Sequence, residues 1–154
     1  MCCKTPGTES NMTGICPPSR SFSAGAAPLY EICSRLPAHA VSMGRVLLAG
    51  LSDAELDAYL AGATFKRLTR ATIVAAAPLR REVLRAREQG YAWVAGELDE
   101  SICGLAVPVR DRDGQTVAAM NVSLATGEFT EAEAVAQFLG ELRVAASRLR
   151  ASSR

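Results

Sequence analysis

Apolar residues recur at helical spacing along much of the chain and alternate at strand spacing in its second half. The helical spacing predicts helices from near Pro37 to Leu51, from Ser52 to Gly62, from Pro78 to Gly90 and from Thr130 to near Arg150. Strands are expected at residues 68–74, 91–97, 102–110 and 116–124. Helices followed by an antiparallel meander and a closing helix predict one α+β domain.

Capping signals support these helix boundaries. Ser52 with Glu55 and Thr130 with Glu133 both fit the S/T-x-x-E capping box, in which the two side chains satisfy each other's free backbone N–H groups. Gly90 stands where a glycine ends a helix. Two helix starts and one stop therefore have a local chemical cause.

The dipeptide Asp113-Gly114 lies between the last two expected strands and predicts a hairpin with a two-residue turn. Such a turn sets the pairing of the strands, because each step away from it preserves the register. The predicted register places Gly104 opposite Ser123 and Ala106 opposite Asn121.

This register gives the hairpin two unlike faces. One face is apolar and carries Cys103, Leu105, Val107, Val109, Met120, Val122 and Leu124. The other face carries small or polar residues, namely Gly104, Ala106, Pro108, Ala119, Asn121 and Ser123. Two interpretations remain open: this second face is the floor of a cavity for a small polar ligand, or it lets a helix pack closely while Asn121 and Ser123 bond to the backbone.

Composition excludes several classes of function. The 154 residues have a net charge of +1 at pH 7, with charges that alternate along the chain, so no basic surface for nucleic acid is expected. No apolar run is long enough for a membrane span. Residues 1–28 are rich in Gly, Pro, Ser and Thr and predict an unstructured or foreign leader, without the apolar segment of a secretory signal. A cytoplasmic protein is therefore expected.

The reactive residues do not form a recognisable catalytic or metal-binding set. Five cysteines stand at positions 2, 3, 16, 33 and 103, without C-x-x-C spacing, and are expected to be reduced thiols. The one imidazole, His39, lies far in sequence from Cys103 and is interpreted as a satisfied core residue. Nucleotide-binding and zinc-protease motifs are absent. We therefore expect no catalytic residue, no metal and no cofactor.

Several blocks of sequence resemble the effector-binding domain of the IclR family of bacterial transcriptional regulators. They are LPAHAVSMGRVLLA from Leu36, REQGY from Arg87, Glu97, LAVPVRD from Leu105 with Gly114, and AAMNVS from Ala118. The wording SRLPAHAVSMGRVLLA most resembles the subgroup that regulates aromatic-acid catabolism through the β-ketoadipate pathway. The resemblance covers residues 34–150. It implies a GAF/profilin-like antiparallel sheet flanked by helices, a small organic acid as effector, and a dimer or tetramer.

The resemblance also implies effector-binding residues. By position these are Ser42, Met43, Gly44, Val94, Gly104, Asn121 and Ser123. In the family, backbone N–H groups around Ser42 to Gly44 hold the carboxylate of the effector. The apolar Val94 suits a more apolar or aromatic ligand.

The sequence departs from the family in two ways. No winged helix-turn-helix domain precedes residue 34, so we expect DNA binding only through a domain absent from this chain. Ser101 stands where the family usually has Gly, and Gly104 where it often has Ser or Cys, which enlarges the inferred cavity.

Three hypotheses follow for the function. The favoured one is the ligand-sensing and oligomerisation domain of a transcriptional regulator. The second is a small-molecule enzyme that uses the same pocket, with Cys103 or His39 as the reactive group. The third is a truncated fragment that only self-associates.

Overall fold

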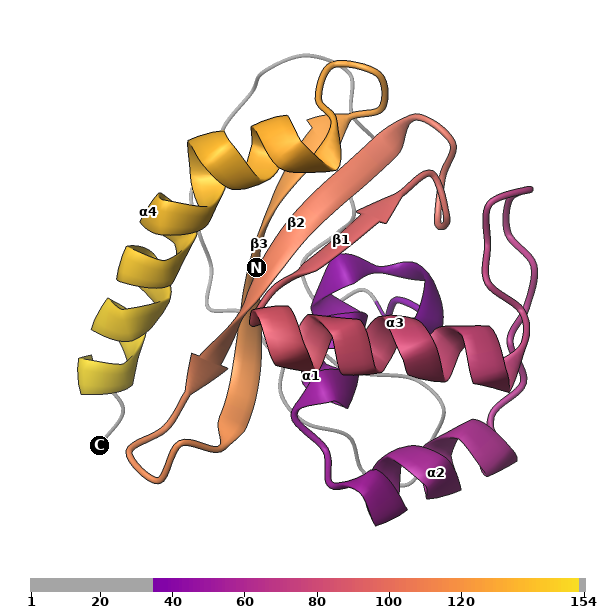
Figure 1. Ribbon diagram of the computed structural model, residues 1–154, viewed down its shortest axis with the longest axis horizontal. Coiled ribbons are helices and arrows are strands. Elements are labelled where there is room, and N and C mark those ends of the chain that lie inside the picture. Colours follow the sequence, from indigo (N-terminus) through magenta and orange to yellow (C-terminus); the bar gives the residue numbers. More distant parts are fainter. Residues whose placement is uncertain (1–34, 153–154) are drawn as a thin grey trace.

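The computed structural model describes residues 35–152, with side chains up to residue 149. Its elements are the 3-10 helix η1 (Ala38–Ala40), α1 (Ser42–Ala49), α2 (Asp53–Gly62), α3 (Ala76–Gln89), β1 (Ala92–Ala95), β2 (Ile102–Arg110), β3 (Thr116–Ala125) and α4 (Glu131–Ser152) (Figure 1). The predicted α+β fold is confirmed. The expected leader at residues 1–28 and four of the five cysteines lie outside the described residues.

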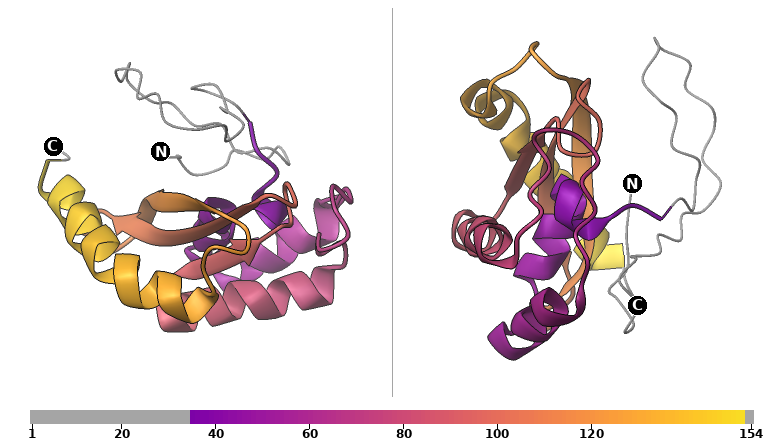
Figure 2. Two further views of the ribbon diagram at one scale, coloured as in Figure 1. Left: turned by 90° about the horizontal axis from the view of Figure 1, so that it is seen from above. Right: turned by 90° about the vertical axis from the view of Figure 1, so that its right-hand side faces the viewer.

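The three strands form one antiparallel sheet in the order β1-β2-β3, with apolar layers on both faces. Helix α4 covers the face that carries Leu105 and Val107 (Figure 2). Helix α1 lies across the other face and contacts all three strands. Helix α3 packs on α1, and α2 packs on α3. No helix in residues 35–152 is long and apolar enough to cross a membrane.

The predicted strand register is confirmed, but the predicted turn is wrong. Gly104 pairs with Ser123, and Ala106 pairs with Asn121. The loop has three residues instead of two, because Asp111 donates its N–H to the carbonyl of Gln115 at 2.9 Å. Between the pairs Val109–Ala118 and Arg110–Thr116, Val117 is an extra residue. This bulge offsets the longer loop and restores the expected register.

Two of the expected boundaries shift. The helix expected from Pro37 divides into η1 and α1, because Val41 between them has an extended backbone with φ −129° and ψ 145°. Strand β1 is shorter than residues 91–97 and ends before Gly96, whose φ of +67° turns the chain out of the sheet.

The strand expected at residues 68–74 is wrong, and this segment is an irregular loop. Thr72 Oγ1 accepts the N–H groups of Leu68 and Thr69, at 3.1 and 2.8 Å, and donates to the carbonyl of Glu97 at 2.7 Å. Thr69 Oγ1 donates to the carbonyl of Gly96 at 2.6 Å. These hydroxyls satisfy backbone groups that a strand would pair with a neighbour.

Both predicted capping boxes are confirmed. Ser52 donates its N–H to Glu55 at 2.8 Å and accepts the Glu55 N–H at 3.3 Å, and Thr130 and Glu133 make the same two bonds at the same distances. Hydrogen bonds from the side chain and backbone of Ser52 lower the pKa of Glu55 below its usual 4.5. Bonds from the backbone and side chain of Thr130 lower the pKa of Glu133 in the same way.

These lowered pKa values predict a pH dependence of stability. The ionised glutamates stabilise the fold above their unfolded-state pKa, and this stabilisation is lost as the pH falls through the lower folded-state pKa. A Ser52→Ala/Thr130→Ala double variant is therefore expected to lose stability less steeply than the parent between about pH 5 and 3. Urea unfolding at several pH values measures this slope. The control Ser147→Ala, whose hydroxyl bonds only to the Val144 carbonyl, should keep the parental slope.

Candidate functional site

The predicted site residues on the sheet form two adjacent rows on one face. The first row runs across the sheet from Val94 to Gly104 to Ser123, and the second from Ala92 to Ala106 to Asn121. Directly paired residues point to the same side of a sheet, so both rows face α1. The first turn of α1 lies over the first row, since a Cβ placed on Gly104 would be 2.9 Å from Ser42 Oγ.

The first turn of α1 presents backbone N–H groups without acceptors. Its preceding residue, Val41, makes no side-chain capping bond. Within residues 35–152 the N–H groups of Ser42, Met43 and Gly44 have no hydrogen-bond acceptor. Such a helix end carries partial positive charge and favours an anion. Because Ser42 and Met43 are each 5% exposed, this charge lies in a buried setting.

A close backbone contact fixes the position of this turn. A Cβ on Gly44 would lie 2.3 Å from the carbonyl oxygen and 2.4 Å from the Cα of Ala38 in η1. Only glycine fits there, so Gly44 allows η1 to pack directly against α1.

The structure decides between the two open interpretations for part of the face that carries small residues. Ala106 and Ala119 are fully buried in the core cluster with Met43 and Leu47, so a helix packs closely there and no cavity floor exists. Gly104 is also covered closely by α1, because a Cβ added to it would collide with the side chain of Ser42. Ser42 therefore occupies the space that the missing side chain of Gly104 was expected to leave, and in the first row only Ser123 is exposed.

The two rows end on β3 with polar side chains. Asn121 is half-buried and Ser123 is exposed, and Asn121 Nδ2 donates to Ser123 Oγ at 3.1 Å. The expected bonds from these two side chains to the backbone do not occur within the described part of the chain. Thus α1, β1, β2 and β3 bring the seven predicted residues into one region, but their role as effector contacts remains a prediction.

A buried ion pair between Arg45 and Glu97, which was not predicted as part of a site, holds α1 in place. Arg45 Nη2 donates to Oε1 and Oε2 of Glu97 at 2.7 and 2.6 Å. The side chains are 3% and 9% exposed. Arg45 also donates to the carbonyl of His39 at 3.3 Å, and the Glu97 carbonyl accepts from Thr72. One network therefore joins α1, η1, the 63–75 loop and the β1–β2 loop.

The two reactive groups considered for an enzyme lie on opposite sides of the sheet. His39 is buried beside α1, with Nε2 3.0 Å from the carbonyl of Lys66, as expected for a satisfied core residue. Cys103 belongs to the alternating set that faces α4, and burial raises the pKa of its thiol. They cannot act as a nucleophile and its base. Residues 35–152 also contain no group of three or more metal-ligating side chains.

Comparisons with known proteins agree on one family. The family model described as "Bacterial transcriptional regulator IclR C-terminal" matches residues 26–151. The Pca regulon regulatory protein of Pseudomonas putida is 41% identical over 118 residues, which cover 77% of this chain and 40% of that protein. The HTH-type transcriptional regulator XynR of Escherichia coli is 37% identical over 121 residues, covering 78% and 48%. The chain thus spans less than half of each relative.

Solved structures match the fold closely. The inducer-binding domain of an Acinetobacter PobR double mutant, crystallised with 3-hydroxybenzoic acid, superimposes with a TM-score of 0.83 at 28% identity, covering 97% of this chain and 85% of that one. The C-terminal domain of Escherichia coli KdgR gives a TM-score of 0.73 at 34% identity, covering 78% and 73%.

Proposed function

Because the chain belongs to the family of IclR C-terminal domains of bacterial transcriptional regulators, we propose that it senses a small organic acid. The observation that carries this proposal is the uncapped, buried first turn of α1 above the row from Val94 to Ser123.

The carboxylate of the effector is proposed to bind the N–H groups of Ser42, Met43 and Gly44. These donors are fixed in place by the contact of Gly44 with Ala38, so little ordering is needed when the anion binds. The side chain of Asn121, with Ser123 beside it, supplies a second polar group for a hydroxyl of the ligand.

We further propose that the ligand is aromatic. Met43 and Val94 are apolar and nearly fully buried at the site, and apolar side chains favour a ring over a second charge. The names of two similar proteins support this choice: one regulates a Pca regulon, and the other was crystallised with 3-hydroxybenzoic acid.

We propose that effector binding controls DNA binding through a separate DNA-binding domain of the regulator. The sensing domain would be residues 34–150, with residues 1–28 outside it, working as a cytoplasmic dimer or tetramer. An effector that binds one arrangement of α1 better than another shifts the population between them. The Arg45–Glu97 pair would pass a shift of α1 to the β1–β2 loop.

Calorimetric titration tests the proposal. We expect 3-hydroxybenzoate or a related aromatic acid to bind the chain with one site per copy, and its neutral methyl ester not to bind. The same acids should be recovered unchanged after incubation, whereas turnover would favour the enzyme hypothesis. A folded chain that binds neither aromatic acids nor dicarboxylates such as adipate would contradict the proposal and leave only self-association.

A further inference from the structure

A hollow of about 280 Å³ lies where the C-terminal end of α3, the end of β2 and the second half of α4 meet. Its lining includes Val107 and Ala146, whose side chains are only 1% and 6% exposed, so the hollow reaches down to the core. Arg110 of β2 and Arg143 of α4 also line it. The hollow therefore combines an apolar floor with two guanidinium groups.

The two guanidinium groups have no carboxylate partner within residues 35–149. None of the ion pairs in this part of the chain includes Arg110 or Arg143. Arg110 Nη1 donates to the carbonyl of Gly114 at 2.9 Å. Arg143 Nη2 donates to the carbonyl of Gln89 at 3.1 Å. Because a guanidinium has five N–H groups, most of these donors are left for a ligand.

The acid next to Arg110 in the sequence is bound elsewhere. Asp111 Oδ1 accepts the backbone N–H groups of Asp113 and Gln115, at 3.0 and 2.9 Å. Its carboxylate thus holds the β2–β3 loop in shape and forms no ion pair with Arg110 within the described residues. Two positive charges at the hollow remain without a partner of opposite charge there.

A buried hydroxyl group lies beside the hollow. Thr116 is 7% exposed, and its Oγ1 has no hydrogen-bond partner in the part of the chain that the structure describes. It lines a small cavity of about 10 Å³, which shares Gly90, Pro108 and Arg110 with the lining of the hollow. Leaving a buried hydroxyl without a partner costs stability. This second observation points to a polar ligand atom at the same place.

We propose that the hollow binds a phosphate group, carried by free phosphate or by a small phosphate monoester. Such a group has a charge of about −1.5 to −2 at neutral pH and several acceptor oxygens. It matches two guanidinium groups and one hydroxyl, whereas a monocarboxylate balances only one of the two charges. Planar guanidinium groups also suit phosphate oxygens, because two N–H groups bond in parallel. The organic part of a monoester would contact Val107 and Ala146.

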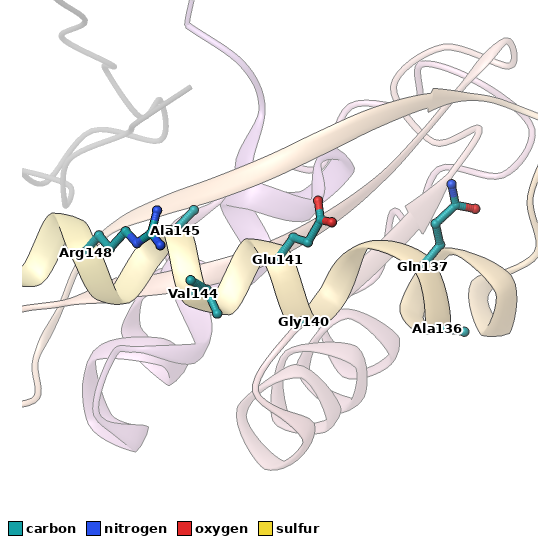
Figure 3. A pocket seen from close by; sticks show the side chains of 7 residues that line it. All are labelled: Ala136, Gln137, Gly140, Glu141, Val144, Ala145 and Arg148. Atoms are coloured by element: carbon teal, nitrogen blue, oxygen red, sulfur yellow. The ribbon is translucent and has the colours of Figure 1, made fainter.

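The hollow on the outer side of α4 does not share these features (Figure 3). Its lining residues all belong to α4 and include Gln137, Glu141 and Arg148, so it has no wall from a second element and its guanidinium is accompanied by a carboxylate. The phosphate site is also separate from the proposed effector site, with which it has no residue in common. Phosphate binding would therefore be a second ligand input to this domain.

NMR titration of the full chain with isotope-labelled arginine tests the site. Inorganic phosphate is expected to shift the side-chain Nε–H signals of Arg110 and Arg143 until the site is saturated. Acetate, with a single charge, should bind at least about tenfold more weakly. Tighter binding of ethyl phosphate than of inorganic phosphate would identify a monoester as the ligand, and equal binding would identify free phosphate. Equal responses to phosphate and acetate would show only a general attraction of anions and would overturn the proposal.

Three variants test the donors one by one. Arg110→Gln and Arg143→Gln are each expected to weaken phosphate binding by about tenfold, and both positions are exposed, so the fold should be kept. Thr116→Val keeps the shape of the side chain and removes the unpartnered hydroxyl. It should weaken phosphate binding several-fold, roughly as expected for one hydrogen bond, while its thermal midpoint stays the same or rises.

Arg81→Gln is the matched control, since it makes the same charge change on the exposed side of α3. It should bind phosphate as the parent does. Parental affinity in all three site variants, or equal weakening in Arg81→Gln, would contradict the site. Arg143→Gln should keep the parental affinity for 3-hydroxybenzoate, and Asn121→Ala the parental affinity for phosphate. Failure of the phosphate site is therefore distinguishable from failure of effector sensing.

Discussion

Glu97→Ala is expected to lower the free energy of unfolding by about 3–5 kcal/mol, because it leaves a buried charge without its partner. The side chain of Arg45 is only 3% exposed, so water cannot replace the lost carboxylate. Its Nε already has no hydrogen-bond partner in residues 35–152. The substitution also removes an anchor of α1, the helix that carries the proposed effector donors. Urea unfolding of the parent and the variant measures the loss.

Two further variants show whether burial causes the loss. Replacing both partners, as Arg45→Met/Glu97→Leu, removes the charge and its desolvation together and should recover most of the stability. Glu131→Ala breaks the Arg85–Glu131 pair, whose side chains are 53% and 28% exposed, and should cost less than about 1 kcal/mol. Equal losses for Glu97→Ala and Glu131→Ala would contradict a special role of the buried pair.

Gly44→Ala is expected to destabilise the protein by about 1–3 kcal/mol or more and to abolish effector binding, because the added methyl group collides with backbone. The colliding atoms are the Ala38 carbonyl oxygen and Cα, which cannot rotate away as the end of a side chain can. Relief requires η1 and the first turn of α1 to separate, and that turn carries the proposed carboxylate donors. Thermal unfolding and calorimetric titration with 3-hydroxybenzoate measure the two effects.

Gly62→Ala is the matched control for this substitution. Gly62 is the last residue of α2, and a Cβ there meets nothing within 4 Å. Its stability should stay the same or rise, since alanine is the better helix former. Parental stability and effector affinity in Gly44→Ala would show that the close contact of η1 and α1 is not needed.

In the hairpin, local sequence signals predicted the pairing of the strands but not the turn. Asp113-Gly114 and the alternation around it were enough to predict which residues of β2 and β3 pair. The details of the turn were not predictable, because a three-residue loop and a bulge at Val117 give the same register as a two-residue turn. The strand expected at residues 68–74 does not form, because Thr69 and Thr72 bond to loop backbone from other parts of the chain.

The site was predictable only in part, for a similar reason. The alternation of the hairpin placed Gly104, Asn121 and Ser123 on one face, and the family resemblance added Ser42 to Gly44 and Val94. Spacing alone did not show that α1 covers Ala106 and Ala119 while the row at Gly104 keeps a polar edge. The Arg45–Glu97 pair joins residues 52 positions apart in the sequence, so spacing could not predict it. The one local sign of it is that Arg45 is a charged residue within the apolar run of α1.

Titration of an Asn121→Ala variant with 3-hydroxybenzoate tests the central claim most directly, because Asn121 lies at the open edge of the proposed site and is not needed for the core. We expect binding about tenfold weaker than in the parent, from the loss of one hydrogen bond to the ligand, with an unchanged thermal midpoint. The control Gln115→Ala, an amide at the turn of the same hairpin, should bind as the parent does. Parental affinity in Asn121→Ala, or equal weakening in both variants, would contradict a site at the first turn of α1.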